Sequence, residues 1–431
     1  MHVKIESTDH EGRGIARHEG KVIFVRDTLP GEVADIEIIK RNKSYDQAVA
    51  KKLLRGAATR TTPACVNFAR CGGCSLQHAD AGAQVAFKQR VMEDTLRHIG
   101  NVSPGTILPA IQGPPGGYRH RARLSVRYVA KKGGVLVGFH ERHSRYITEM
   151  FGCEILPPRV SALIPRLRAL IGLLSVRDAL PQIEITLCEA ADILVLRLLA
   201  SLTEADKDLL KVFADEHRVQ LYLQANSPDS AKLFYPDAPP KAYYTLPEFG
   251  LTLCFLPTQF TQVNPAINRV LVRRAISLLR PQPGERIADL FCGIGNFALP
   301  LAKRGAEVVG IDGNRGIIAQ ARENADRNHL AVKFVQANLF TITPPEFGQW
   351  GLFDKLLIDP PREGALQVLR SLSPPLPKSI LYVSCNPATL ARDAGFLVHS
   401  LGYNFACAGV LNMFPHTAHV ESIALFELPL A

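Results

Sequence analysis

The sequence lacks an apolar run long enough to cross a membrane. Its most apolar stretch, from Ile193 to Leu202, is short and contains Arg197, whereas a spanning helix needs about 20 apolar residues. The opening residues MHVKIESTDHEGRG are polar, without the hydrophobic segment of a secretory signal. We therefore expect a cytoplasmic protein.

Acidic residues are outnumbered by basic ones, and the imbalance favours a polyanionic partner. The chain has 50 Lys and Arg residues against 40 Asp and Glu, a net charge of +10. Clusters of basic residues are typical of nucleic-acid-binding proteins. The residues that crowd the first third of the chain are Lys40, Arg41, Lys43, Lys51, Lys52 and Arg55, followed by Arg119, His120, Arg121, Arg123 and Arg127.

No internal repeat or low-complexity tract interrupts the chain, and 431 residues are too many for one core. Residues 1–55 alternate apolar and polar positions, which predicts a small all-β barrel of oligonucleotide-binding type. Residues 56–255 mix strands and helices, which predicts an α+β domain, and a helix near 85–98 is expected to pack on the C-terminal domain. In residues 256–431 strands alternate with helices, which predicts a mostly parallel, doubly wound α/β sheet.

The chain has nine cysteines. Because the cytoplasm is reducing, we do not expect them to form a framework of disulfides. Cys65, Cys71 and Cys74 form a C-x5-C-G-G-C pattern, and Cys153 follows far downstream. Four soft ligands suit zinc or an iron–sulfur cluster. Zinc sites usually show two close pairs, so the spacing leans slightly towards the cluster. The other cysteines are Cys188, Cys254 and Cys407 in apolar runs, Cys292 in a glycine-rich loop, and Cys385 at the end of a predicted strand.

The glycine-rich loop lies in DLFCGIGNF, from Asp289 to Phe297. Glycines after a strand let a ligand approach the backbone closely, and Asp312 closes the next strand, where a carboxylate can bind ribose hydroxyls. Such a loop suits a dinucleotide or S-adenosylmethionine. The third glycine of the pyrophosphate-binding pattern is missing, which favours an adenosyl cofactor without a pyrophosphate.

Two further motifs follow predicted strands of the same domain. DPPR begins at Asp359, and LYVSCNPATLARD carries Cys385 at the end of its apolar run. The carboxyl ends of parallel strands meet at one edge of a sheet, where α/β proteins bind ligands. A lone cysteine is more often a core residue, and Glu421 in HVES would by itself be a surface glutamate.

Together these motifs resemble the RNA uracil-5-methyltransferases, nearly from end to end. The motifs in chain order are Gly12-x-Gly14, Leu29-Pro30-Gly31-Glu32, the four cysteines, Tyr118-Arg119-x-Arg121-Ala122-Arg123, Phe260-x-Gln262-x-Asn264, DLFCGIGNF, DPPREG, SCNPATLARD and HVES. The resemblance implies a TRAM domain in 1–55, a central RNA-binding domain in 56–255 and a Rossmann-like class I methyltransferase domain in 256–431. A chain that combines a TRAM domain with an iron–sulfur cluster resembles the branch of this family that methylates uridine 1939 of 23S ribosomal RNA.

The resemblance also implies roles for individual residues. Cys385 would be the nucleophile that adds to carbon 6 of uracil, and Glu421 the base that removes the proton from carbon 5. The implied contacts of S-adenosyl-L-methionine are Gln262, Phe291, Asn296, Asp312, Asn338 and Asp359, those of the RNA are Phe260, Asp359 and Arg123, and the implied ligands of a 4Fe–4S cluster are Cys65, Cys71, Cys74 and Cys153.

The alternatives to this reading are a tRNA uracil-5-methyltransferase, a non-catalytic RNA-binding assembly factor and a dinucleotide-dependent oxidoreductase with a cluster. Basic charge and a barrel would suit an assembly factor. The joint presence of Asp359, Cys385 and Glu421 favours an enzyme that uses covalent catalysis. We expect it to act as a monomer.

Overall fold

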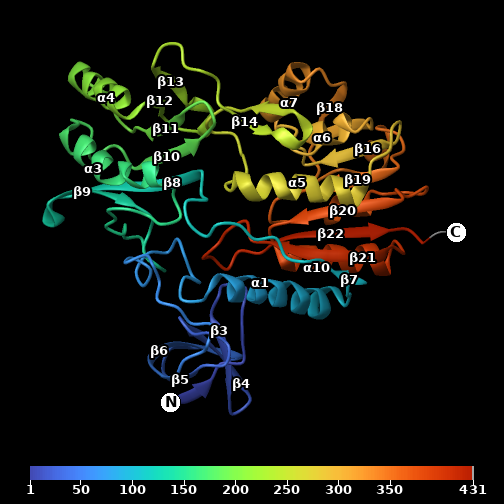
Figure 1. Ribbon diagram of the computed structural model, residues 1–431, viewed down its shortest axis with the longest axis horizontal. Helices are drawn as coiled ribbons and strands as arrows, with labels where there is room; N and C mark the ends of the chain where they lie inside the picture. The colour runs from blue at the N-terminus through green and yellow to red at the C-terminus, as the bar shows by residue number, and fades with distance from the viewer. Residues whose placement is uncertain (430–431) are drawn as a thin grey trace.

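The computed structural model describes residues 1–429, with an N-terminal barrel beside two domains that are each built on a further sheet (Figure 1). The barrel is a six-stranded sheet in the order β1-β5-β6-β4-β3-β2. Alternate residues of β4 and β5, among them Ile23, Val25 and Ile36, fill its core. This confirms the predicted all-β beginning. Its strands are β1 (His2–Lys4), β2 (Ser7–Thr8), β3 (Gly14–His18), β4 (Lys21–Arg26), β5 (Val33–Arg41) and β6 (Tyr45–Arg55).

The segment after the barrel leads to the C-terminal domain. Residues 56–80 contain no helix and no extended strand. Helix α1 (Ala81–Thr95), prolonged by a π-helical turn (Leu96–Gly100), buries Met92 in the same core as residues of α10 (Pro387–His399). Strand β7 (Thr106–Ile107) pairs in parallel with β21 (Asn404–Leu411). Residues 81–107 thus pack with the C-terminal domain, as expected for the helix near 85–98, whereas the sequence had placed β7 in the central domain.

The central domain is a second six-stranded sheet, in the order β13-β12-β11-β10-β8-β9, packed on helices. Helix α4 begins with a capping box in which Thr203 and Asp206 satisfy each other's backbone N–H groups. The α+β prediction is therefore confirmed. The elements are β8 (Arg121–Val129), β9 (Gly134–Gly138), α2 (Pro158–Ser161), α3 (Leu163–Leu173), β10 (Gln182–Leu187), β11 (Asp192–Arg197), α4 (Glu204–His217), β12 (Val219–Gln224) and β13 (Lys232–Tyr235), with short 3-10 turns at Ala130–Lys132 and Pro228–Ser230; a third such turn, Pro247–Phe249, follows this domain.

The C-terminal domain is built on an eight-stranded sheet in the order β18-β17-β16-β19-β20-β22-β21-β7. Its first five strands run parallel and β22 runs antiparallel to both neighbours. Strand order reverses between β16 and β19, and such switch points form ligand crevices. The strands not yet bounded are β16 (Arg286–Leu290), β17 (Glu307–Asp312), β18 (Val332–Gln336), β19 (Lys355–Ile358), β20 (Ser379–Ser384) and β22 (Glu421–Glu427).

Helices cover both faces of this sheet, as the alternating pattern predicts. One core joins the sheet to α5 (Pro265–Leu279), α6 (Ala298–Lys303), α7 (Arg315–Arg327) and the hairpin of β14 (Tyr243–Leu246) and β15 (Leu251–Cys254). The other joins it to α1, α8 (Pro344–Gly348), α9 (Leu366–Arg370) and α10. The β14–β15 hairpin therefore packs with the C-terminal domain, ahead of the predicted boundary at residue 256.

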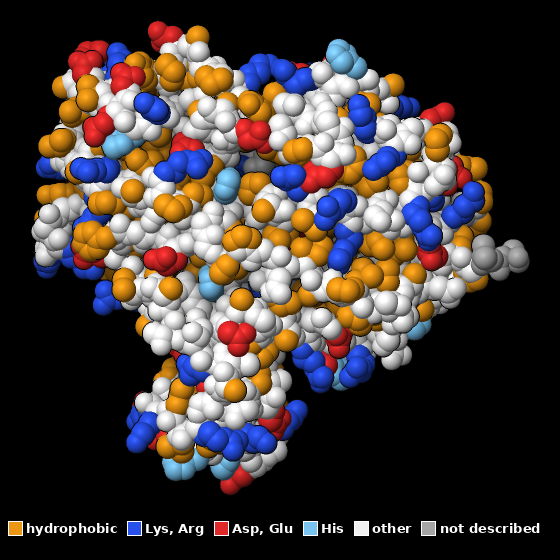
Figure 2. All heavy atoms as spheres, viewed as in Figure 1, with side chains coloured by type: hydrophobic (Ala, Val, Ile, Leu, Met, Phe, Trp, Pro, Cys, Tyr) orange, Lys and Arg blue, Asp and Glu red, His pale blue; other side chains and the backbone are white. Residues whose placement is uncertain are grey.

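Basic side chains lie on several parts of the surface. Figure 2 shows Lys and Arg side chains on the barrel, at the bottom of the view, and over the C-terminal domain. Within residues 1–429, none of the helices has both the length and the apolarity that crossing a bilayer requires. The exposed basic residues of the barrel named in the sequence are Lys40, Arg41, Lys43, Lys51, Lys52 and Arg55.

Candidate active site

Cys385 and Glu421 lie opposite each other at the carboxyl edge of the C-terminal sheet. Strand β20 ends at Ser384, and because β22 runs antiparallel to it, Ser384 pairs with Ser422. One step outward from this pair stand Cys385, the residue that follows β20, and Glu421, the first residue of β22. The register of two strands thus brings a thiol and a carboxyl group together.

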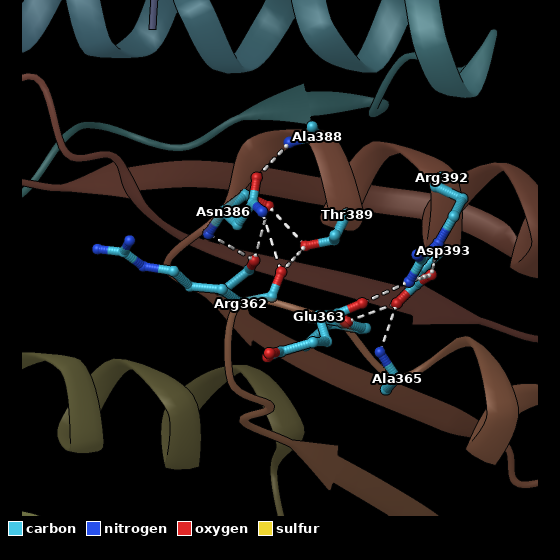
Figure 3. Close-up of polar contacts among 10 residues, drawn as sticks. Arg362, Glu363, Ala365, Asn386, Ala388, Thr389, Arg392 and Asp393 are labelled. Carbon is cyan, nitrogen blue, oxygen red and sulfur yellow. Dashed lines mark hydrogen bonds and ion pairs between the residues drawn. The ribbon is translucent and has the colours of Figure 1, made fainter. Parts of the chain in front are cut away.

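A tight turn holds Cys385 at the end of β20, and Figure 3 shows the polar contacts of the next residue, Asn386. Asn386 caps α10, with its Oδ1 accepting a bond from Ala388 N at 3.0 Å, and Ser384 Oγ accepts one from Asn386 N at 3.1 Å. Pro387 takes the first position of α10, where a helix loses nothing by its missing N–H. The sequence around Cys385 therefore serves to close the turn that presents it.

The same helix anchors the loop that follows β19, as Figure 3 shows. Asn386 Nδ2 donates to the carbonyl of Arg362 at 2.9 Å, and buried Asp393 accepts a bond from Ala365 N at 2.7 Å. Gly364 has a φ of +79°, which suits glycine and few other residues. The segment SCNPATLARD thus holds the loop DPPREG in place through hydrogen bonds.

Burial shifts the pKa values of the carboxyl groups at this edge. Glu421 is 4% exposed, and burial together with the charge of Asp359 raises its pKa to about 8. Burial raises the pKa of Asp359 to about 7. Burial, then the charges of Glu421 and Asp359, raises the pKa of the Cys385 thiol to about 11, and nearby Arg362 opposes that rise. Little of the thiol is therefore ionised at neutral pH while Glu421 and Asp359 carry their negative charges.

Asp289, the first residue of DLFCGIGNF, is a buried carboxyl group without a hydrogen-bonding partner. Within residues 1–429 neither of its oxygens accepts a bond of normal geometry, although the N–H of Ala298 is near enough to oppose the rise in its pKa. Burial, and then the charge of Asp359, raises the pKa of Asp289 well above its usual range. An unsatisfied buried acid can accept a cationic or hydrogen-bond-donating ligand.

Aromatic rings and a carboxylate lie where β16, β17 and β18 end. Phe291 has a φ of +63°, rare for an aromatic residue, and its ring centroid lies 5.5 Å from that of Phe340. Asp312 accepts bonds from Gly293 N at 3.2 Å and from Asn314 N at 2.9 Å, which holds the two loops together. Apolar and acidic groups thus flank the switch point.

The three side-chain amides predicted to bind the cofactor differ in how many of their hydrogen-bonding groups are left for a ligand. Asn296 exchanges two 3.0 Å bonds with Asn268 and accepts one from Tyr244 at 2.9 Å. Only one of its side-chain N–H groups is left for a ligand. Asn338 is exposed after β18, and its Oδ1 accepts a backbone bond two residues on. Gln262 is half-buried in the loop before α5.

A cavity of about 670 Å³ opens beside Cys385 and is lined by four parts of the chain, one of them the end of α1 with Thr95. The C-terminal domain contributes Arg362 and His419, the cysteine-rich segment contributes Cys74, and the barrel contributes Glu11. A second cavity, of about 440 Å³, shares residues 72–75 as a wall. The thiol therefore lies at a space that the barrel helps to form.

Phe260 and Arg123, predicted to touch the RNA, are not among the residues that line this cavity. Phe260 is 67% exposed on a loop whose carbonyl at Gln259 accepts a bond from Arg121. Arg123 Nε donates to Glu184 Oε1 at 2.8 Å. The arginines of this motif thus also stabilise the fold and brace the loop that carries Phe260.

The four cysteines predicted as cluster ligands lie within range of each other's charges. Burial raises the pKa of Cys74 to about 11, and the charges of Cys71 and Cys65 add to the rise. Burial raises the pKa of Cys153 to about 12, with Cys74 and Cys65 again contributing. Within the described part of the chain, however, no three His, Cys, Asp or Glu side chains form a group that could hold one metal ion.

Three residues of this edge had not been predicted as site residues. Asp289 and Arg362 lie inside the motifs that predicted the site, so a charged side chain at these positions could have identified them as site residues. Phe340 follows Asn338 by two positions, and nothing in the sequence distinguishes it from a core aromatic residue.

Comparison with known proteins agrees with this geometry. Residues 251–428 match the family tRNA (Uracil-5-)-methyltransferase, and residues 1–50 match the TRAM domain. The chain is 58% identical to 23S rRNA (uracil(1939)-C(5))-methyltransferase RlmD of Nitrosospira multiformis, over 99% of this chain and 98% of that one. It is 57% identical to the protein of the same name from Thiobacillus denitrificans, over 99% of each.

A solved structure is similar over the whole chain. It is the crystal structure of Pyrococcus abyssi tRNA (uracil-54, C5)-methyltransferase in complex with S-adenosyl-L-homocysteine, with a TM-score of 0.76, 25% identity and 99% of each chain covered. The likeness extends to full-length relatives in sequence and to a full-length neighbour in fold. The chain therefore belongs to the RNA uracil-5-methyltransferase family, and within it to the group called RlmD.

Proposed function

We propose that this protein methylates carbon 5 of a uridine in 23S ribosomal RNA, at the position 1939 named for its relatives, with S-adenosyl-L-methionine as the methyl donor. The observation that carries the proposal is the opposition of Cys385 and Glu421 across the ends of β20 and β22. A nucleophile and a base must reach the same pyrimidine ring, and one sheet edge supplies both.

Cys385 acts as the nucleophile in the first half of the reaction. Its thiolate adds to carbon 6 of uracil, and the electron pair of the ring double bond moves to make carbon 5 nucleophilic. With a pKa of about 11, the thiol of the free protein is mostly protonated at neutral pH. Arg362 favours the thiolate, and a proton on Asp359 would remove one of the two charges that oppose it, which leaves Glu421 as the carboxylate that the second half needs.

Glu421 acts as the base in the second half. Once carbon 5 carries the methyl group, its proton passes to the carboxylate, the C5–H electron pair restores the ring double bond, and the bond from carbon 6 to sulfur breaks. A carboxylate with a pKa of about 8 is a stronger base than an exposed glutamate and is matched to a neutral working pH.

The residues around the switch point fit S-adenosyl-L-methionine, which supplies an electrophilic methyl group. The unpartnered oxygens of Asp289 suit its cationic methionine end. Asp312 suits ribose hydroxyls, and the rings of Phe291 and Phe340 offer an apolar surface for adenine. The further contacts proposed are Gln262, Asn296, Asn338 and Asp359.

The RNA would meet the protein over the barrel, the cysteine-rich segment and the C-terminal domain. A base inside a helix cannot reach Cys385, so the uridine must leave its stack and enter the cavity. Exposed Phe260 can stack on a base. The exposed lysines and arginines of the barrel can contact phosphates, and Arg123 can do so beside Glu184.

We also propose that Cys65, Cys71, Cys74 and Cys153 hold a 4Fe–4S cluster. The support is that the four thiols lie near enough to influence each other's pKa values and that four cysteine thiolates are a ligand set for such clusters. Anaerobically purified protein should contain iron and acid-labile sulfide. Stoichiometric zinc without sulfide would refute the cluster.

The second candidate substrate is tRNA, favoured by the likeness to the Pyrococcus abyssi enzyme, and a non-catalytic assembly factor remains the third candidate. We favour ribosomal RNA because relatives at 57–58% identity carry that name over their full length. We further propose that the protein acts as a monomer in the cytoplasm, which light scattering and cell fractionation would test.

The deciding experiment offers deproteinised 23S rRNA and total tRNA, each free of 5-methyluridine, to the protein with labelled S-adenosyl-L-methionine. We expect label in one uridine of the rRNA, mapped by mass spectrometry, and none with Cys385→Ala. Label in tRNA would support the second candidate. Binding of rRNA without methylation by the wild type would support the assembly factor.

A further inference from the structure

Lys88 is a lysine that the proposed chemistry does not use and that the fold encloses. The residue is 2% exposed on α1, and its Nζ donates to Asn412 Oδ1 at 2.7 Å and to the carbonyl of Phe414 at 2.8 Å. Within residues 1–429 no carboxylate forms an ion pair with it, and burial lowers the pKa of Lys88 to about 7. An apolar side chain of similar volume would avoid the cost of burying this charge.

Both acceptors of Lys88 belong to the loop between β21 and β22, residues 412–420. One turn earlier on α1, Gln84 Oε1 accepts a bond from His416 N at 2.7 Å. The loop also donates from Ala418 N to Ser75 Oγ at 3.0 Å. Helix α1 and the end of the cysteine-rich segment therefore hold this loop from outside the sheet.

The loop leads directly into the proposed base. Strand β22 begins at Glu421 immediately after it, and Leu411, just before it, pairs with Glu421. Residues 417–420 also line the cavity at Cys385. A displaced loop would therefore move the carboxyl group and the adjoining wall, whereas Cys385 is carried by β20 and by the cap of α10.

We propose that Lys88 is a positioning residue for proton removal: its ammonium fixes the 412–420 loop so that Glu421 meets the proton on carbon 5. The inference rests on the proposed function, because it assigns Lys88 to the second half of that reaction. Lys88 acts through Asn412 and Phe414. Its loss should slow proton removal and leave addition of the Cys385 thiolate to carbon 6 in place.

The test compares Lys88→Met with Arg90→Met, which removes a cation from the exposed side of the same helix, where Arg90 pairs with Asp94 at 2.7 Å. Each protein is mixed with target rRNA and S-adenosyl-L-methionine in a single turnover and run on a denaturing gel. We expect Lys88→Met to accumulate the covalent protein–RNA band and to release 5-methyluridine about ten- to a hundredfold more slowly. Cofactor affinity should be unchanged, and Arg90→Met should match the wild type.

Asn412→Leu provides an independent test, since it removes an acceptor and keeps the lysine. It should show the same delay, and the double variant should be no slower than the slower single variant, because both act through one contact. Should Lys88→Met fail to fold, Asn412→Leu carries the test. Release at the wild-type rate, or an equal slowing of addition and release, would overturn the role of Lys88. A wild-type protein that forms neither adduct nor product would instead overturn the proposed function.

Discussion

The barrel and the edge of the C-terminal sheet shift the pKa of a buried carboxyl group in opposite directions. Glu32 of the barrel is fully buried, and burial alone would raise its pKa, but Arg60 and the backbone N–H groups of Leu29 and Ala57 hold the pKa below its ordinary value. Glu421 is almost as buried, and its pKa rises to about 8. The residue type is the same and both side chains are buried, but Glu32 faces Arg60 whereas Glu421 faces Asp359.

The central domain has a buried carboxyl group whose pKa is lowered, as in the barrel. Burial would raise the pKa of Asp206, yet bonds from Ser175 and Thr203 lower it to about 2. Acids of this kind are satisfied by their own fold and stabilise it. An acid such as Glu421 or Asp289, enclosed without such partners, is destabilising in the free protein and marks a place where a substrate or cofactor completes the set.

The largest expected effect is on turnover when Glu421 is neutralised. Glu421→Gln keeps the shape of the side chain and removes the base, so turnover should fall about 10²- to 10⁴-fold. Addition should still occur, and a denaturing gel should show a slow protein–RNA band that Cys385→Ala and the double variant lack. Turnover at the wild-type rate would remove Glu421 from the chemistry and make Asp359 the next base to test.

Glu32→Gln should show the reverse pattern, with stability lost and chemistry kept. It leaves Arg60 without its partner at 2.8 Å (Nη2 to Oε2), and we expect the barrel to lose about 3 kcal/mol in free energy of unfolding. Urea titration measures the loss, and single-turnover methylation at saturating RNA should be unchanged below the transition. An unchanged unfolding midpoint would contradict the contrast between the two regions.

The pH dependence of stability should separate the two acids. The folded pKa of Glu421 is about 8 against an ordinary 4.5, so its contribution is fully present below about pH 4.5 and is lost as pH rises to about 8. Wild-type stability should therefore fall relative to Glu421→Gln over this range. Glu32, with a lowered pKa, contributes stability that is lost only as pH falls. Parallel curves for the wild type and Glu421→Gln would contradict the assignment.

The smallest expected effect concerns the exposed lysines of the barrel. Replacing Lys43 and Lys52 by Gln should reduce the steepness of log affinity for RNA against log salt by about 1 to 2. Binding of S-adenosyl-L-methionine should not change. Lys378→Gln, in front of β20 at the opposite edge of the sheet, is the control. An unchanged salt slope would remove these two lysines from the phosphate contacts.

Much of the architecture could be predicted because its signals are local. Alternation of apolar residues marks a strand, and glycine, proline and capping residues mark where strands and helices end, so the barrel and the doubly wound sheet followed from the chain. The boundary at residue 256 did not, nor did the place of β7, because β7 and the β14–β15 hairpin pack with the C-terminal domain through contacts distant in sequence. Arg123 likewise looked free for RNA, and its pairing with Glu184 depends on a neighbouring strand.

The sequence by itself determined which groups are available: a cysteine after one strand, carboxyl groups near the ends of others, glycines where a ligand must approach, and a basic barrel. Only the tertiary structure decided their chemical state. The antiparallel register of β20 and β22 sets Glu421 opposite Cys385, and enclosure without a cation raises the pKa of Glu421, while an equally buried Glu32 is neutralised by Arg60. A pKa depends on the solvent and charges within a few ångströms, and those are set by residues that fold next to the group rather than by residues next to it in the chain.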